Sequence, residues 1–179
     1  LLGFPGPLII GPLLSDAPAY DALKDFAPVS LAVSAPFVLL VNPNVPATSM
    51  KELVTLAKAR PGKLNYASGG TGITSHMAME LFKLVADIDM VHVPYKGAGP
   101  GMTALLGAEV AALFAAIPAA LPHLKSGRLR ALAVGGAARS PLLPDVLTIT
   151  ESGFQFDAAS WYGVLAPKHT PRDVVARLH

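Results

Sequence analysis

The stretch 64–82 constrains the fold of this chain more than any other part of its sequence. Its first four residues have the apolar pattern of a short strand, and the run Ser-Gly-Gly-Thr-Gly follows directly. A helical pattern begins after the glycines and is expected to place Ile73, Met77, Leu81 and Leu84 on one face. A strand, a tight turn and a helix in this order predict an α/β unit with the helix N-terminus beside the strand end.

The turn of this unit carries groups that bind anions. The first N–H groups of a helix lack partners within the helix, and the helix dipole adds partial positive charge there. Hydroxyls in the turn can donate hydrogen bonds, and its glycines let a ligand approach the backbone. The candidate ligand-binding residues are Ser68, Gly69, Gly70, Thr71, Gly72 and Thr74. In the alternative interpretation the glycines serve only the turn, and Thr74 or Ser75 caps the helix. The residues alone do not decide between the two.

A second candidate loop spans residues 94–101. Tyr95 offers an aromatic face, Lys96 a cation and Gly97 a flexible backbone. Lys96 either contacts a ligand directly or is a solvated loop lysine, and the sequence leaves both interpretations open.

Strand and helix patterns alternate along the rest of the chain. The long extended stretch 26–42 is followed by a helix for which Ser49 and Glu52 have the spacing of a capping box. The alternation predicts an α/β layer structure with largely parallel strands. Residues 1–18, rich in glycine and proline, are expected to be a strand end followed by irregular structure. If 26–42 and 129–136 cross between two lobes, residues 1–41 and 131–179 form lobe 1, and 42–130 form lobe 2.

Several classes of function are excluded by composition. Fourteen basic and twelve acidic residues give a net charge of +2 without a basic run, which argues against nucleic-acid binding. The absence of cysteine excludes disulfides, thiolate metal sites and cysteine catalysis. The five histidines lack a second ligand at metal-binding spacing, so each is expected to stand alone and no metal site is predicted. The apolar stretch 103–121 contains a glycine, a glutamate and a proline, which favour buried helix, strand and helix over a membrane span.

No cofactor or catalytic residue is predicted. A dinucleotide fingerprint would need a third glycine where Ser75 stands, and no Gly-Lys-Ser/Thr follows the turn. Ser68 does not lie in a Gly-x-Ser-x-Gly motif, and no triad of Ser68, His76 and an acid can be recognised. The turn is therefore expected to hold an anion rather than to transform it.

Several motifs together resemble the tripartite tricarboxylate transporter receptors, also called Bug-type receptors. They are DFAPVS (25–30), YASGGTGITSHMAMELF (66–82), VPYKGAGPGMTALLGAEV (93–110), PHLKSGRLRALAV (122–134), RSPLLPDV (139–146) and WYGVLAPKHTP (161–171). The resemblance implies a periplasmic, type II-like binding protein of the Venus-flytrap kind. Its two α/β lobes are expected to close on a small carboxylate, either a di- or tricarboxylate or an aromatic carboxylate. The resemblance further implies a monomer without cofactor that delivers its ligand to membrane permease subunits.

The resemblance also implies roles for individual residues. It assigns carboxylate binding to the turn residues given above and to Tyr95, Lys96 and Gly97. The resemblance is weaker for Gly3, Phe4 and Pro5, to which it assigns ligand binding from the other lobe. Ala111 and Ala115 stand where the family often has aspartates, which disfavours an amino-acid ligand and favours a plain or aromatic carboxylate.

Two expectations complete the sequence-based picture. The chain is expected to be truncated at both ends, because family elements before residue 1 and after residue 179 are absent from the sequence. The alternatives to a transport receptor are a carboxylate sensor that signals to a membrane kinase and, more distantly, a hydrolase.

Overall fold

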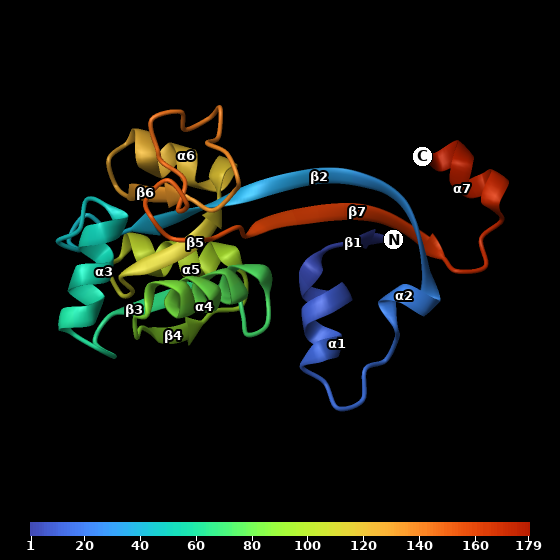
Figure 1. Ribbon diagram of the computed structural model, residues 1–179, viewed down its shortest axis with the longest axis horizontal. Helices are drawn as coiled ribbons and strands as arrows, with labels where there is room; N and C mark the ends of the chain where they lie inside the picture. Colours follow the sequence, from blue (N-terminus) through green and yellow to red (C-terminus); the bar gives the residue numbers. More distant parts are fainter. The chain divides into compact units, whose positions relative to one another are not determined.

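The computed structural model describes all 179 residues, which form two compact units. Unit 1 comprises residues 1–35, 72–74 and 160–179, and unit 2 comprises residues 36–71 and 75–159. Residues 131–159 thus group with the middle of the chain, because β6 (Arg130–Val134) pairs with the second part of β2 (Phe26–Val41). The division into two lobes proposed from the sequence stays a prediction. Figure 1 shows the elements of the chain, coloured from the N-terminus to the C-terminus.

Unit 2 is a mixed sheet with helices on both faces. After β2 its elements are α3 (Met50–Ala59), β3 (Asn65–Ser68), α4 (Thr74–Ala86), β4 (Val91–Pro94), α5 (Ala98–Leu106), β5 (Ala112–Ala116), α6 (Ile117–Lys125) and β6. The strands β3, β4 and β5 are parallel to one another, as helical crossovers require. The prediction of largely parallel pairing is nevertheless wrong at β2, which runs antiparallel to both β5 and β6.

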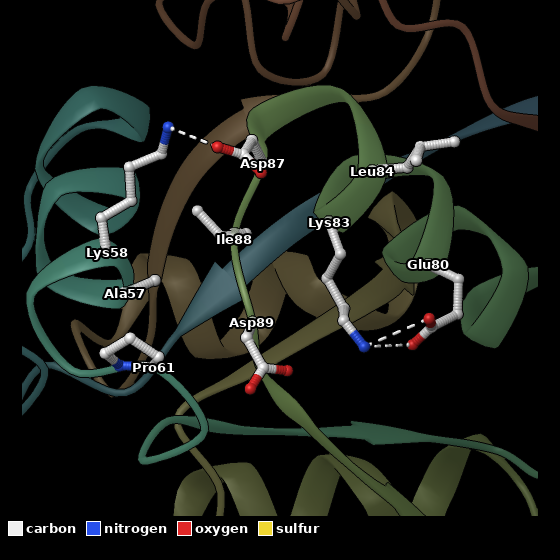
Figure 2. A pocket seen from close by; sticks show the side chains of 9 residues that line it. All are labelled: Ala57, Lys58, Pro61, Glu80, Lys83, Leu84, Asp87, Ile88 and Asp89. Carbon is white, nitrogen blue, oxygen red and sulfur yellow. Dashed lines mark hydrogen bonds and ion pairs between the residues drawn. The ribbon is translucent and has the colours of Figure 1, made fainter.

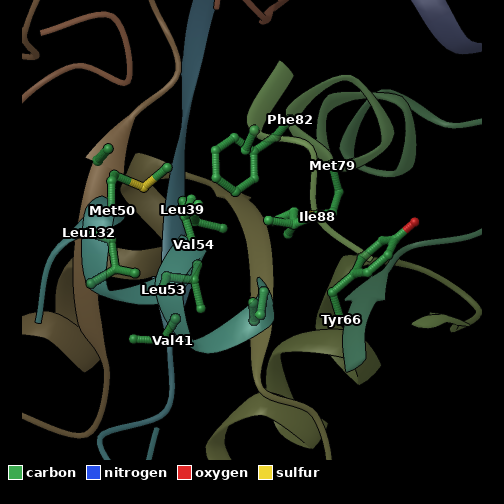
Figure 3. Close-up of a cluster of buried hydrophobic side chains, with 14 of the residues drawn as sticks. Leu39, Val41, Met50, Leu53, Val54, Tyr66, Met79, Phe82, Ile88 and Leu132 are labelled. Atoms are coloured by element: carbon green, nitrogen blue, oxygen red, sulfur yellow. The ribbon is translucent and has the colours of Figure 1, made fainter. Parts of the chain in front are cut away.

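Alternate residues of β2 build the two halves of the core. Leu39 and Val41 belong to a cluster that also buries α3 and α4, shown in Figure 3. Val38 and Leu40 point to the other face and pack with α5 and α6. Because both faces are covered, these four strand residues are fully buried and read in the sequence as a continuous apolar run.

The buried face of α4 differs from the predicted one. Its buried residues are Ser75, Ala78, Met79, Phe82 and Ala86, whereas Leu81 is 38% and Leu84 79% exposed. Two sets of apolar residues with helical spacing compete on this helix, and the set containing Phe82 is the one that packs against α3 and β2. The face inferred from leucine spacing is therefore wrong.

The capping box of α3 forms with one change of partner. The Ser49 hydroxyl accepts a hydrogen bond from the Glu52 N–H at 3.3 Å, as predicted. The Glu52 carboxylate, however, accepts from the Thr48 N–H at 2.6 Å and the Thr48 hydroxyl at 2.7 Å. Glu52 therefore bonds to Thr48, one residue before the Ser49 N–H that a simple capping box would use. Together with the Ser49 bond, this contact stabilises the start of α3.

Unit 1 contains more regular structure than its sequence suggested. Its elements are β1 (Leu2–Gly3), the π-helical segment η1 (Gly6–Ile10), α1 (Gly11–Leu13), α2 (Ala22–Asp25), the first part of β2, β7 (Ala159–Pro167) and α7 (Arg172–Leu178). The expectation of irregular structure over residues 1–18 is therefore wrong for 6–13. Prolines occupy the first turn of η1 and of α1, where the proline ring suits the helical φ and no N–H is required.

The apolar stretch 103–121 forms the end of α5, the strand β5 and the start of α6, which confirms the predicted sequence of elements. None of the helices combines the length and the hydropathy that a transmembrane segment requires.

Candidate functional site

The two candidate loops of unit 2 lie side by side. Strands β3 and β4 are parallel, so both loops leave the same edge of the sheet. The Ser68 carbonyl accepts a hydrogen bond from the Tyr95 N–H at 2.9 Å, and the Gly69 carbonyl accepts from the Gly97 N–H at 2.9 Å. The structure thus joins residues 68–71, called the glycine-rich turn from here on, to the loop 95–97.

The N-terminus of α5 is open at this edge. Gly97 is the N-cap residue, with φ 111° and ψ 169°, and no side chain caps the helix. The residues Ala98 and Gly99 that follow it are exposed. Lys96, directly before the cap, is exposed as well. An uncapped helix N-terminus beside a lysine favours an anion at this position.

Ser68 supports the glycine-rich turn from inside. It is fully buried, and its hydroxyl oxygen accepts a hydrogen bond from the Gly70 N–H at 3.2 Å. The same oxygen lies 3.0 Å from the Gly70 carbonyl and 2.6 Å from Nε2 of His92. The hydroxyl is therefore engaged within the protein, while Thr71 at the tip of the turn is exposed. Direct ligand contacts of both residues stay predictions.

His76 and His92, for which the sequence predicted no partner at metal-ligand spacing, contact each other through their rings. Their rings stack with centroids 3.9 Å apart, and the ring of Tyr66 stacks on His92 at 5.0 Å. The parallel register pairs Tyr66 with His92, and His76 joins them from α4. The sequence carries no signal for this contact, because register between strands cannot be read from spacing along the chain. No group of three side chains suited to a metal ion occurs in the structure.

A carboxylate lies at the other end of this stack. The Tyr66 hydroxyl donates a hydrogen bond to Glu80, and Lys83 Nζ lies 2.8 Å from the Glu80 carboxylate and 5.7 Å from the centre of the Tyr66 ring. Burial alone would raise the pKa of Glu80, but hydrogen bonds from Lys83 and Tyr66 outweigh it and hold the pKa below its ordinary value. Burial, and then the Glu80 contact, raises the pKa of Tyr66.

This arrangement lacks the geometry of a hydrolase triad. Ser68 hydrogen-bonds to His92, but the Glu80 carboxylate is bonded to Tyr66 and Lys83 instead of orienting the imidazole. The Ser68 side chain is also buried, so a substrate carbonyl cannot reach it without opening the turn.

The histidine stack predicts a stability that depends on pH. Burial lowers the pKa of His92 and of His76, and Glu80 only partly opposes this effect. Between the ordinary value of 6.5 and the lowered values, the unfolded chain binds more protons than the folded chain. Stability is therefore expected to be complete above the ordinary value and to fall as the pH drops through the lowered values.

The measurement is the urea midpoint at about pH 7.5 and about pH 5.5, compared between wild type and His76→Phe. The variant keeps an aromatic ring in the stack and should lose less stability at the lower pH. An equal loss in both proteins would show that other groups govern acid sensitivity.

The predicted contribution of unit 1 lies on a strand end and a short helix. Gly3 pairs with Gly163 of β7, and the ring of Phe4 lies 5.8 Å from that of Tyr162. Pro5 is buried directly before η1. A role for Gly3, Phe4 and Pro5 in ligand binding stays a prediction.

Figure 2 shows a hollow of about 620 Å³ between α3 and α4, which is separate from the two candidate loops. None of the predicted site residues lines it. Two ion pairs, Lys58 with Asp87 and Lys83 with Glu80, neutralise much of its charge. Its lining residues are Ala57, Lys58, Pro61, Glu80, Lys83, Leu84, Asp87, Ile88 and Asp89.

Comparison with known proteins identifies relatives that match nearly the whole chain. The model of a family described as "Tripartite tricarboxylate transporter family receptor" matches residues 7–179. Protein BugT of Bordetella pertussis is 39% identical over 174 residues, which cover 97% of this chain and 53% of the relative.

Two solved structures share the fold. The structure of R. palustris Rpa4515 with adipate superposes with a TM-score of 0.91 at 36% identity, covering 99% of this chain and 60% of that one. The periplasmic binding protein BugD superposes with a TM-score of 0.87 at 32% identity, with the same coverage. The chain has the α/β fold of these binding proteins, and it spans about half the length of the curated relative.

Proposed function

Because this chain belongs to the family of tripartite tricarboxylate transporter receptors, we propose that it carries part of a binding site for a small carboxylate. The observation that carries the proposal is the pairing of the glycine-rich turn with the loop 95–97, which brings the turn next to the open N-terminus of α5. Backbone N–H groups aimed at one place bind a carboxylate through charge-assisted hydrogen bonds. The exposed Thr71 hydroxyl and Lys96 ammonium add donors at the same edge.

The wider role follows from the family, whose members are periplasmic receptors that bind substrates. We propose that the protein acts as an extracytoplasmic solute-binding receptor, without catalysis or cofactor, and delivers its ligand to the permease of a tripartite transporter. The adipate bound to Rpa4515 supports a dicarboxylate as the first class to test.

The β5 strand bears on the choice of ligand. Ala115 is buried among apolar residues, and Ala111, directly before the strand, has no side-chain polar group. An ammonium group on the ligand would find no carboxylate at either position. We therefore propose a plain or aromatic carboxylate rather than an amino acid.

A screen of the full-length protein tests this function. Mono-, di- and tricarboxylates, with adipate among them, are added separately and the unfolding midpoint is measured. A ligand that binds only the folded state raises the midpoint as its concentration exceeds its Kd. A shift with one class supports the proposal, and no shift with any carboxylate contradicts it.

Thr71→Val is expected to weaken binding of the carboxylate found in this screen about ten-fold while leaving the fold intact, since one hydrogen bond to a charged group is lost. The measurement is the Kd by calorimetry. Thr55→Val, an exposed threonine on α3, is the matched control and should bind like wild type. An unchanged Kd for Thr71→Val would reject the assignment of this hydroxyl.

A further inference from the structure

The contact between His92 and Ser68 is not explained by ligand binding or by core packing alone. His92 lies on β4 and is only partly buried, yet its Nε2 is 2.6 Å from a fully buried hydroxyl. That hydroxyl in turn holds the Gly70 N–H at 3.2 Å. A chain of two hydrogen bonds therefore runs from an imidazole to the backbone of the glycine-rich turn.

The geometry lets His92 determine where the Ser68 proton points. When Nε2 carries no proton, the Ser68 O–H donates to it and the oxygen accepts from Gly70. When Nε2 carries a proton, it donates to the Ser68 oxygen, and the O–H is left to donate to the Gly70 carbonyl at 3.0 Å. Both states hold the turn, but they bond its backbone differently.

The surroundings keep the imidazole in place. His76 from α4 stacks on one side of it, and Tyr66 from β3 lies over it at 5.0 Å. The charged groups near it are Glu80 and Lys83 of α4, which are paired with each other. All of these residues belong to unit 2, so the arrangement does not depend on unit 1.

We propose that His92 is a positioning residue: through Ser68 it fixes the backbone of the glycine-rich turn and thereby the donors offered to the carboxylate. The effect on the donors rests on the proposed function, whereas the effect on the backbone of the turn does not depend on any ligand. His92 does not touch the ligand in this proposal; it acts only through the hydroxyl that it orients.

The direct test is amide hydrogen exchange at Gly70 in the full-length protein. His92→Phe keeps a ring in the stack but removes the bond to Ser68, and should raise the Gly70 exchange rate about five-fold. Ser68→Ala should raise it by a similar factor, and the double variant no further, because both changes break one chain of bonds. His123→Phe, a histidine on α6 of the same unit, should leave the rate unchanged.

The second readout is the affinity for adipate as a function of pH. Protonated His92 adds positive charge behind the turn, so the ratio of wild-type to His92→Phe affinity should increase as the pH falls. Taking this ratio cancels the protonation of adipate itself. A purely structural ring would give a ratio independent of pH.

The outcomes separate the two proposals. An unchanged Gly70 exchange rate in His92→Phe, or effects of the two variants that multiply, would overturn the positioning role. Failure of the wild type to bind any carboxylate would count against the proposed function, while the exchange rates would still decide how the turn is held.

Discussion

Replacing Phe82 with alanine is expected to lower the free energy of unfolding by about 3–5 kcal/mol, which is the usual cost of removing a buried phenylalanine. The Phe82 side chain is completely buried. Its ring meets Phe154 at 5.9 Å and Phe156 at 6.4 Å, both nearly edge-on. The variant therefore leaves a cavity between α4 and the loop that carries these rings, and it loses two favourable aromatic contacts.

The matched control is Leu84→Ala, two residues further along α4. Leu84 is 79% exposed, so the change should alter the free energy of unfolding by less than about 0.5 kcal/mol. Urea unfolding of both variants in the full-length protein measures the difference. A large effect of Leu84→Ala with a small effect of Phe82→Ala would instead support the helix face inferred from leucine spacing.

This pair of variants also shows where sequence reasoning failed for the fold. Helical periodicity located α4 well, but two apolar sets with the same spacing lie on it, and only packing decides which is buried. Likewise, each crossover to a parallel strand was predictable from local pattern, whereas the antiparallel position of β2 depends on pairing with β5 some seventy residues later. Individual helices and strands could be predicted from the sequence, whereas the pairing of strands far apart in the chain could not.

The candidate site, like the fold, was predicted from the sequence only in its local features. The turn, its glycines and the helix that follows were predicted from residues that are neighbours in sequence. Residues 94–101 were predicted to form a loop that precedes a helix, yet α5 already begins at Ala98. Pro100 is tolerated there, since a proline in the first turn needs no N–H partner. The stacking of Tyr66, His76 and His92 depends on the register of β3 and β4 and on the packing of α4 beside them, and it was missed. The supporting residues therefore emerge only from the structure.

Gly97→Ala is expected to destabilise the start of α5 by about 1–3 kcal/mol, because the backbone there adopts a conformation that side chains disfavour. Gly97 has φ 111° and ψ 169°, and an added Cβ would meet no atom within 4 Å. The cost thus comes from the backbone conformation and not from crowding. Urea unfolding of the full-length protein measures it.

Gly99→Ala separates this effect from the mere loss of a glycine. Its added Cβ also finds open space, but its backbone is helical without positive φ, so alanine there should be neutral or stabilise by up to about 1 kcal/mol. Equal effects of the two variants would show that the conformation of Gly97 is unimportant.

The same pair bears on ligand binding. The Gly97 N–H donates a hydrogen bond to the glycine-rich turn at 2.9 Å. If the backbone at position 97 changes its conformation to accommodate alanine, this bond is expected to break and the first N–H groups of α5 to turn away from the turn. On the proposed function, the affinity for the carboxylate found in the screen should then fall about ten-fold in Gly97→Ala, which corresponds to about 1.4 kcal/mol, and change little in Gly99→Ala. If Gly97→Ala lowers stability but leaves affinity unchanged, the N-terminus of α5 is not part of the proposed carboxylate site. The donors must then come from the turn alone.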